Sequence, residues 1–201
     1  MTRLIFFVLL LSLVSTMADA QQAESQDELL SEVVKAATEQ DTFRAIDLIE
    51  SQGNTSDVAQ NYAQLVQGLY YKKKNVPLML RIGQAGVHYC LLQARHAKDD
   101  KAALLSTAKM IAFNLSVNCW PAWEDEGISL TSADIAAGHD LARLNLRLAK
   151  ELDRPADKVA SAWWLLGAHQ MAAKETEQAI ASFDKAAALF AEAKQGDGQW
   201  M

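Results

Sequence analysis

Apolar residues near the C-terminal end of the sequence recur at the three- and four-residue intervals of an α-helix. The residues that carry this pattern are Trp163, Leu166, Gly167, Ala179, Phe183 and Ala186. The first three lie close together on one helix and the last three on another, because residues three or four apart are neighbours on a helix surface. Small and large side chains alternate in the second set, which lets two helices pack closely. The spacing predicts two helices over residues 160–193.

These residues resemble the tetratricopeptide repeat, a unit of about 34 residues that folds as two antiparallel helices. Gly167 would remove a side chain where the second helix approaches the first. Gln170 stands where the family usually has an aromatic residue, which implies looser packing there. A single unit cannot bury its apolar face alone, so the resemblance implies that the unit stacks on neighbours and leaves a groove.

The rest of the sequence also favours helices. Half of its 201 residues are hydrophobic, and it has nine glycines and three prolines, a balance that disfavours a strand-and-turn architecture. Helical spacing, capping residues and prolines predict eight helices. The predicted boundaries fall near residues 40, 53, 75–77, 98–99, 118–130, 153–155 and 174–176.

Eight consecutive helices form four antiparallel hairpins in the simplest arrangement. We therefore predict an all-α fold whose hairpins stack as a right-handed superhelix resembling tetratricopeptide proteins. The sixth helix repeats the spacing of the eighth, with Ala142, Leu146 and Ala149. Further upstream the match is weak, because only Gly68 and Tyr71 follow the repeat pattern.

The N-terminal residues have the three parts of a secretory signal peptide. Arg3 is followed by an apolar run, Leu4 to Val14, and then by the small residues of Ala18-Asp19-Ala20. The run is shorter than the roughly 20 residues that a membrane-spanning helix needs. We predict cleavage after Ala20, a mature domain over residues 21–201, and a secreted or periplasmic protein without a membrane span.

Charge and motifs narrow the class of function. The formal net charge is -6, which argues against nucleic acid as a partner, since binding phosphates requires clustered Lys and Arg. The four histidines have no pair at the four-residue spacing of a helical metal site. No local motif supplies a nucleophile with its base, and no glycine-rich phosphate loop is present. We expect no enzyme activity, no cofactor and no metal.

The seventh helix carries the residues that the resemblance places in the groove: Ser161, Trp164, Ala168 and Met171. Trp164 follows Trp163 and therefore points about 100° away from it around the helix. Aromatic and methionine side chains are favoured at binding surfaces. These positions lack the Lys, Arg and Asn with which one subclass of the family grips acidic peptide ends. The alternative is that Trp164 packs against the sixth helix.

A second candidate site lies in the break between the fifth and sixth helices. Trp120 and Trp123 belong there to the run Cys-Trp-Pro-Ala-Trp-Glu-Asp-Glu. The two rings either form a stacking platform for a sugar or small molecule, or fill the core beneath the loop. The main hypothesis is thus an exported, non-catalytic scaffold that binds a protein or peptide in a helical groove. The alternative is a small-molecule or glycan binder that uses this loop.

The two cysteines, Cys90 and Cys119, would form a disulfide in an oxidising compartment only if the helices bring them together. A turn near residues 98–99 places them ~18 Å apart along the helix axis at about 1.5 Å per residue. A disulfide needs Cα atoms within about 7 Å of each other. A bond would therefore require the fifth helix to end early.

Overall fold

The computed structural model describes residues 24–197, and side chains for residues 24–194. The predicted signal peptide, residues 1–20, lies outside the described residues. Within the described part of the chain every regular element is a helix, which confirms the prediction of an all-α fold. The right-handed superhelix stays a prediction.

The chain divides into two compact units, residues 1–48 and residues 49–201. In the first unit, the helical residues 24–39 are followed by α2 (Thr42–Glu50), which continues into the second unit. The Asp41 carboxylate accepts a hydrogen bond from the amide of Arg44 at 2.8 Å, so Asp41 caps α2.

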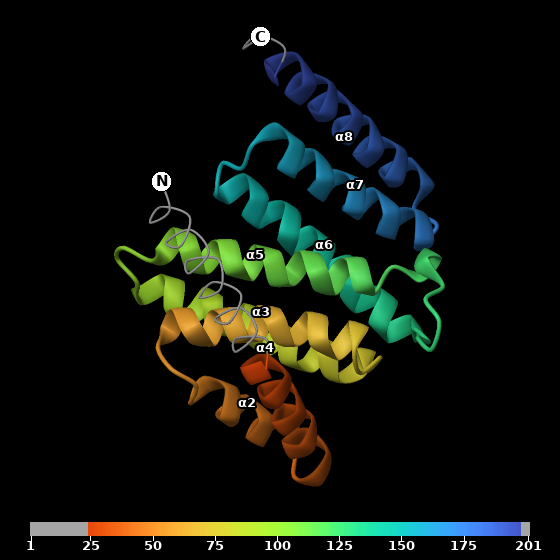
Figure 1. Ribbon diagram of the computed structural model, residues 1–201. Helices are drawn as coiled ribbons and strands as arrows, with labels where there is room; N and C mark the ends of the chain where they lie inside the picture. The colour runs from red at the N-terminus through yellow and green to blue at the C-terminus, as the bar shows by residue number, and fades with distance from the viewer. Residues whose placement is uncertain (1–23, 198–201) are drawn as a thin grey trace, which may run out of the picture. The chain divides into compact units, whose positions relative to one another are not determined.

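The second unit contains the remaining helices in chain order. They are α3 (Thr55–Tyr71), α4 (Val76–His96), α5 (Lys101–Asn118), η1 (Pro121–Trp123), α6 (Ser132–Glu151), α7 (Ala156–Ala172) and α8 (Thr176–Asp197). From α3 to α8 each α-helix packs on the next, and α3 also packs on α5. Figure 1 shows α5, α6, α7 and α8 side by side in this order. Connections of three or four residues join these neighbours, except between α5 and α6, where residues 119–131 intervene.

Side-chain caps fix where α3 and α6 begin. Asn54 caps α3, because its side-chain oxygen accepts hydrogen bonds from the amides of Ser56 and Asp57 and the Asp57 carboxylate accepts one from the Asn54 amide. Thr131 and Asp134 form the same reciprocal arrangement at the start of α6.

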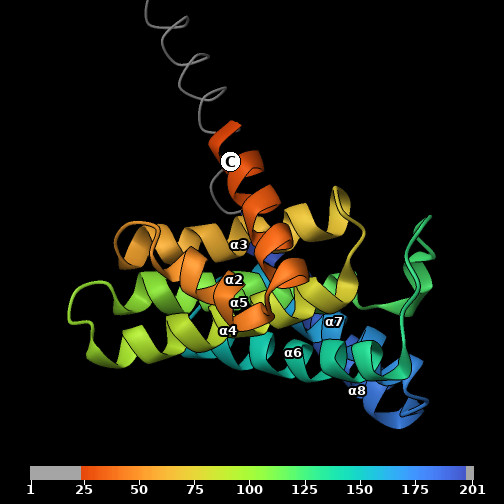
Figure 2. The same ribbon diagram turned by 90° about the horizontal axis from the view of Figure 1, so that it is seen from below.

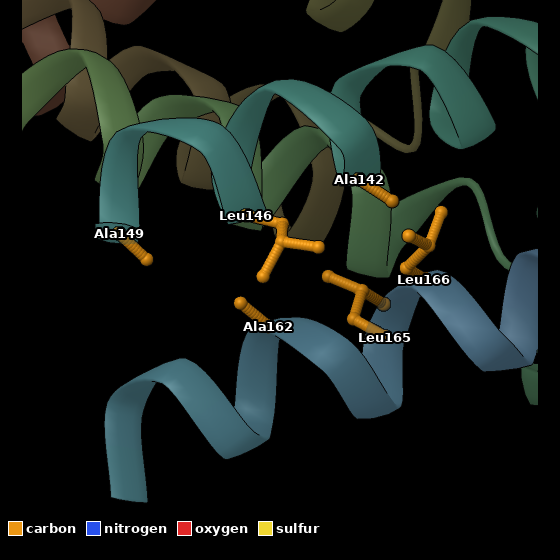
Figure 3. Close-up of a cluster of buried hydrophobic side chains, with 6 residues drawn as sticks. All are labelled: Ala142, Leu146, Ala149, Ala162, Leu165 and Leu166. Carbon is orange, nitrogen blue, oxygen red and sulfur yellow. The ribbon is translucent and has the colours of Figure 1, made fainter. Parts of the chain in front are cut away.

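The helix pair α6 and α7 encloses a compact apolar cluster (Figure 3). Its members are Ala142, Leu146, Ala149, Ala162, Leu165 and Leu166. The repeated spacing in α6 thus serves packing against α7. Trp163 covers the cluster. The ammonium groups of Lys150 and Lys185 lie over its ring, at 4.4 and 4.3 Å from the ring centroid.

The pair α7 and α8 has the close approach that the repeat residues predict. A Cβ atom on Gly167 would lie 2.8 Å from the ring of Phe183, so only glycine fits there without a shift. Ala179 and Ala186, which precede and follow Phe183 along α8, are also buried. At Gln170, where the family usually has an aromatic residue, the Ser182 hydroxyl donates to the side-chain oxygen at 2.7 Å, and both side chains are buried.

Upstream, the pattern of Gly68 and Tyr71 does not mark a similar contact. Tyr71 is 62% exposed, so it does not pack between helices as the repeat's aromatic residue would. The tight contacts involve α4 instead. A Cβ on Gly83 would meet Leu115, and one on Gly86 would lie 2.6 Å from the Cβ of Tyr62.

We expect Gly86→Ala to destabilise the protein more than Gly167→Ala. At Gly86 the new methyl group meets a Cβ atom that cannot move without the backbone, whereas at Gly167 it meets the ring of the half-buried Phe183. Overpacking costs roughly 1–3 kcal/mol, partly offset by the helix preference of alanine over glycine. Urea unfolding of wild type and both variants measures how much each substitution lowers the free energy of unfolding. Equal decreases in the two variants would contradict the assigned contacts.

Cys90 and Cys119 are both free thiols and both fully buried, so they do not form a disulfide. The fifth helix continues to Asn118 instead of ending early. Burial raises the pKa of each thiol to about 12. Because the thiolate is the reactive form, burial and this pKa both suppress thiol chemistry in the folded state.

We therefore expect a thiol reagent such as Ellman's reagent to leave the folded protein unlabelled at pH 8. After unfolding in denaturant without a reductant, two thiols should react per chain. Labelling that reaches fewer than two thiols in the unfolded protein would indicate a disulfide.

Candidate binding site

The connection between α5 and α6 is held in place by hydrogen bonds at several points. The indole N–H of Trp123 donates to the carbonyl oxygen of Val117 at 2.9 Å. The Tyr70 hydroxyl, on α3, donates to a carboxylate oxygen of Asp125 at 2.6 Å. Figure 2 shows this connection at the edge of the view, extending beyond the helix ends. The connection therefore has a defined position relative to α3 and α5.

Burial raises the pKa of the Tyr70 hydroxyl, and the Asp125 carboxylate raises it further. The hydroxyl therefore keeps its proton throughout the physiological pH range and remains a donor to Asp125. Gly127, at φ 77°, completes the turn that follows, in a backbone conformation that glycine adopts without strain.

The structure brings the two predicted sites together. The Trp120 ring packs edge-to-face against Trp164 of α7, with centroids 5.6 Å apart and an angle of 75°. On its other side it packs against Trp123, at 5.0 Å and 89°. Trp164 thus contacts the α5–α6 connection, and the two predicted sites are neighbours.

A pocket of about 530 Å³ lies beside Trp120, between this connection, α7 and α8; we call it the apolar pocket. Every residue that lines it is apolar: Trp120, Pro121, Ala122, Trp164, Ala168, Met171, Ala172 and Phe183. Trp164 is 40% exposed and Met171 47% exposed, so both are accessible from solvent. Three of the four predicted groove residues therefore line one pocket.

Ser161 is the predicted groove residue that does not line the apolar pocket. Its hydroxyl donates to the carbonyl oxygen of Asp157 within α7 at 2.8 Å. This hydrogen bond satisfies the hydroxyl locally, as is common for serine within helices.

A second pocket, of about 380 Å³, lies on the other side of Trp120 and Pro121; we call it the loop pocket. Its lining combines aromatic, acidic and aliphatic residues: Tyr70, Trp120, Pro121, Trp123, Glu124, Asp125, Ile128, Ser129, Leu130 and Ile135. Because the two pockets share Trp120 and Pro121, they are neighbours separated by one wall. Trp123, the second residue of the predicted aromatic loop, lines only the loop pocket.

Two histidines from different helices meet in the interior, a contact that spacing alone could not reveal. The rings of His139 and His169 are parallel, with centroids 6.1 Å apart and an interplanar angle of 5°. His169 Nε2 lies 3.0 Å from both the hydroxyl and the carbonyl oxygen of Ser116 on α5. Burial lowers the pKa of His169 to about 4 and also lowers that of His139. The pair is therefore neutral near pH 7.

Among the described residues, no group of three or more His, Cys, Asp or Glu side chains could hold a metal ion. In the same part of the chain, no helix combines the length and apolar character needed to cross a bilayer.

Comparison with protein-family models, with curated proteins and with solved structures found no match for this chain. The resemblance to the tetratricopeptide repeat therefore rests on the residues themselves.

We expect the neutral His169 to make the folded state sensitive to acid. Its folded-state pKa is about 4, below the ordinary value of 6.5, so the unfolded chain binds more protons between these two values. The free energy of unfolding should therefore fall as pH decreases from 6.5 towards 4, by roughly 3 kcal/mol at most from this residue. Urea unfolding at pH 7 and pH 4.5 measures the change.

The variant His169→Gln should reduce this pH dependence, because glutamine does not titrate in this range. His88→Gln is the matched control, since His88 is exposed on α4. An identical loss of stability on acidification in wild type and His169→Gln would show that His169 does not cause it.

Proposed function

We propose that this chain is an exported, non-catalytic scaffold that binds a segment of another protein in the apolar pocket. The observation that carries the proposal is the gathering of exposed apolar side chains at one place. Trp164 and Met171 from α7 face the same pocket as Trp120 from the α5–α6 connection. Contiguous apolar surface of this kind, in a recess, is typical of interaction sites.

The lining of the apolar pocket supports binding by burial of apolar surface. None of its residues carries a charge, a nucleophile or a general base. A partner would therefore bind by burying its own apolar surface and by matching the shape of the pocket. Tryptophan and methionine contribute large contact areas, and methionine adapts its shape to the partner. An apolar side chain projecting from a peptide or helix fits these properties.

The glycan-binding alternative has less support from the arrangement of the rings. A sugar stacks on a flat aromatic surface, whereas the Trp120 and Trp123 rings are inclined at 89° to each other. The Trp123 N–H is already bonded to Val117, so it is engaged within the fold. We therefore favour a protein segment as the ligand.

The test is a selection of random 12-residue peptides displayed on phage against the chain from Gln21 onward, followed by calorimetry with synthetic peptides. We expect Trp164→Ala to weaken binding of the selected peptides by about 30-fold, since removing such an anchor commonly costs ~2 kcal/mol. Met171→Ala should weaken it less, because methionine is the smaller and more flexible anchor. Circular dichroism would verify that both variants keep their helices.

Met110→Ala is the matched control for Met171→Ala. Met110 lies on α5, is 39% exposed, and does not line the apolar pocket. Its substitution should leave peptide affinity unchanged. Unaltered affinity in Trp164→Ala and Met171→Ala, or failure to select any binding peptide, would refute the proposal.

A further inference from the structure

The loop pocket differs chemically from the apolar pocket beside it. Three aromatic side chains, Tyr70, Trp120 and Trp123, line it together with the carboxylates of Glu124 and Asp125. No lysine, arginine or histidine is among its lining residues. It therefore combines aromatic rings with a negative electrostatic potential, in a space of about 380 Å³.

Both features favour a cation. The face of an aromatic ring attracts cations through its quadrupole, and tryptophan does so most strongly. Trp120 and Trp123 are inclined at 89°, so they form two walls of a corner and not a flat platform. A compact ammonium or guanidinium group can contact the walls of such a corner, whereas a sugar ring needs an extended face.

The two carboxylates have different roles. Asp125 accepts the hydrogen bond from Tyr70 and so fixes the connection to α3. Glu124 is exposed and makes no hydrogen bond or ion pair with the described residues, and its backbone is left-handed at φ 49°. Glu124 is therefore the carboxylate available to a ligand.

We propose that the loop pocket receives a lysine or arginine side chain of the segment whose apolar side chain enters the apolar pocket. This inference rests on the proposed function and specifies the ligand chemistry. The two pockets share Trp120 and Pro121, so one short segment can reach both. The ligand is thus a segment with an apolar anchor close to a basic residue, complementary to the negative charge of the loop.

The experiment uses the peptides selected on the chain from Gln21 onward. Each residue near the apolar anchor is replaced in turn by lysine, norleucine or glutamate, and the affinities are measured by calorimetry. Lysine at one position should bind about three- to tenfold more tightly than norleucine, in the range of a partly desolvated cation–π contact. Glutamate at that position should bind more weakly than either.

Glu124→Gln should abolish the advantage of lysine over norleucine. Glu126→Gln is the matched control, because Glu126 is an exposed carboxylate two residues away that does not line the loop pocket. The two variants change the net charge equally, so a general electrostatic effect would appear in both. Equal affinity for lysine and norleucine peptides, or the same loss in both variants, would overturn the inference while leaving the proposed function intact.

A second measurement probes the loop pocket without any peptide. Tetramethylammonium chloride is titrated while the indole N–H resonances are followed by NMR, with tert-butanol as the neutral analogue and sodium chloride as the ionic-strength control. The Trp120 and Trp123 resonances should shift with the cation alone, and less in Glu124→Gln. If no peptide is selected, the proposed function fails, and a missing cation response would reject the loop pocket separately.

Discussion

The contact between Gly167 and Phe183 determines how α8 lies on α7, and the binding site depends on it. With no side chain at Gly167, the Phe183 ring can lie directly against the α7 backbone. The same ring forms one wall of the apolar pocket. A residue that a sequence comparison would assign only to packing thus also shapes the surface. A side chain at Gly167 would displace the Phe183 ring. Substitutions at Gly167 are therefore expected to alter both the stability of the protein and its affinity for the peptide.

Trp120 connects the site to the rest of the second unit. It lies between Trp123 and Trp164, so a single ring separates the apolar pocket from the loop pocket. Two hydrogen bonds, from Trp123 to Val117 and from Tyr70 to Asp125, hold the α5–α6 connection that carries Trp120. Holding a binding loop at several points reduces the conformational entropy lost when a ligand binds.

The sequence predicted the helices well because their signals are local. Side-chain caps set where α3, α4 and α6 begin, and the spacing at Gly167, Ala179 and Phe183 predicted the α7–α8 contact. The site was predicted only in parts. Trp120 and Trp164 are 44 residues apart in the numbering, and no periodic pattern relates them. Their contact arises from the stacking of α5, α6 and α7, as does the pairing of His139 with His169, so neither could be read from spacing.

Buried polar groups explain why α7 presents Trp164 and Met171 to the pocket and not another pair. His169 contacts Ser116 on α5, and Gln170 accepts from Ser182 on α8. Successive residues of a helix point about 100° apart, so a rotation of α7 by one residue would break both contacts. An unpaired buried polar group costs about 1–3 kcal/mol, so each broken contact would disfavour the rotated helix. The polar contacts on the buried side of α7 therefore select the orientation that exposes the apolar anchors on its other side.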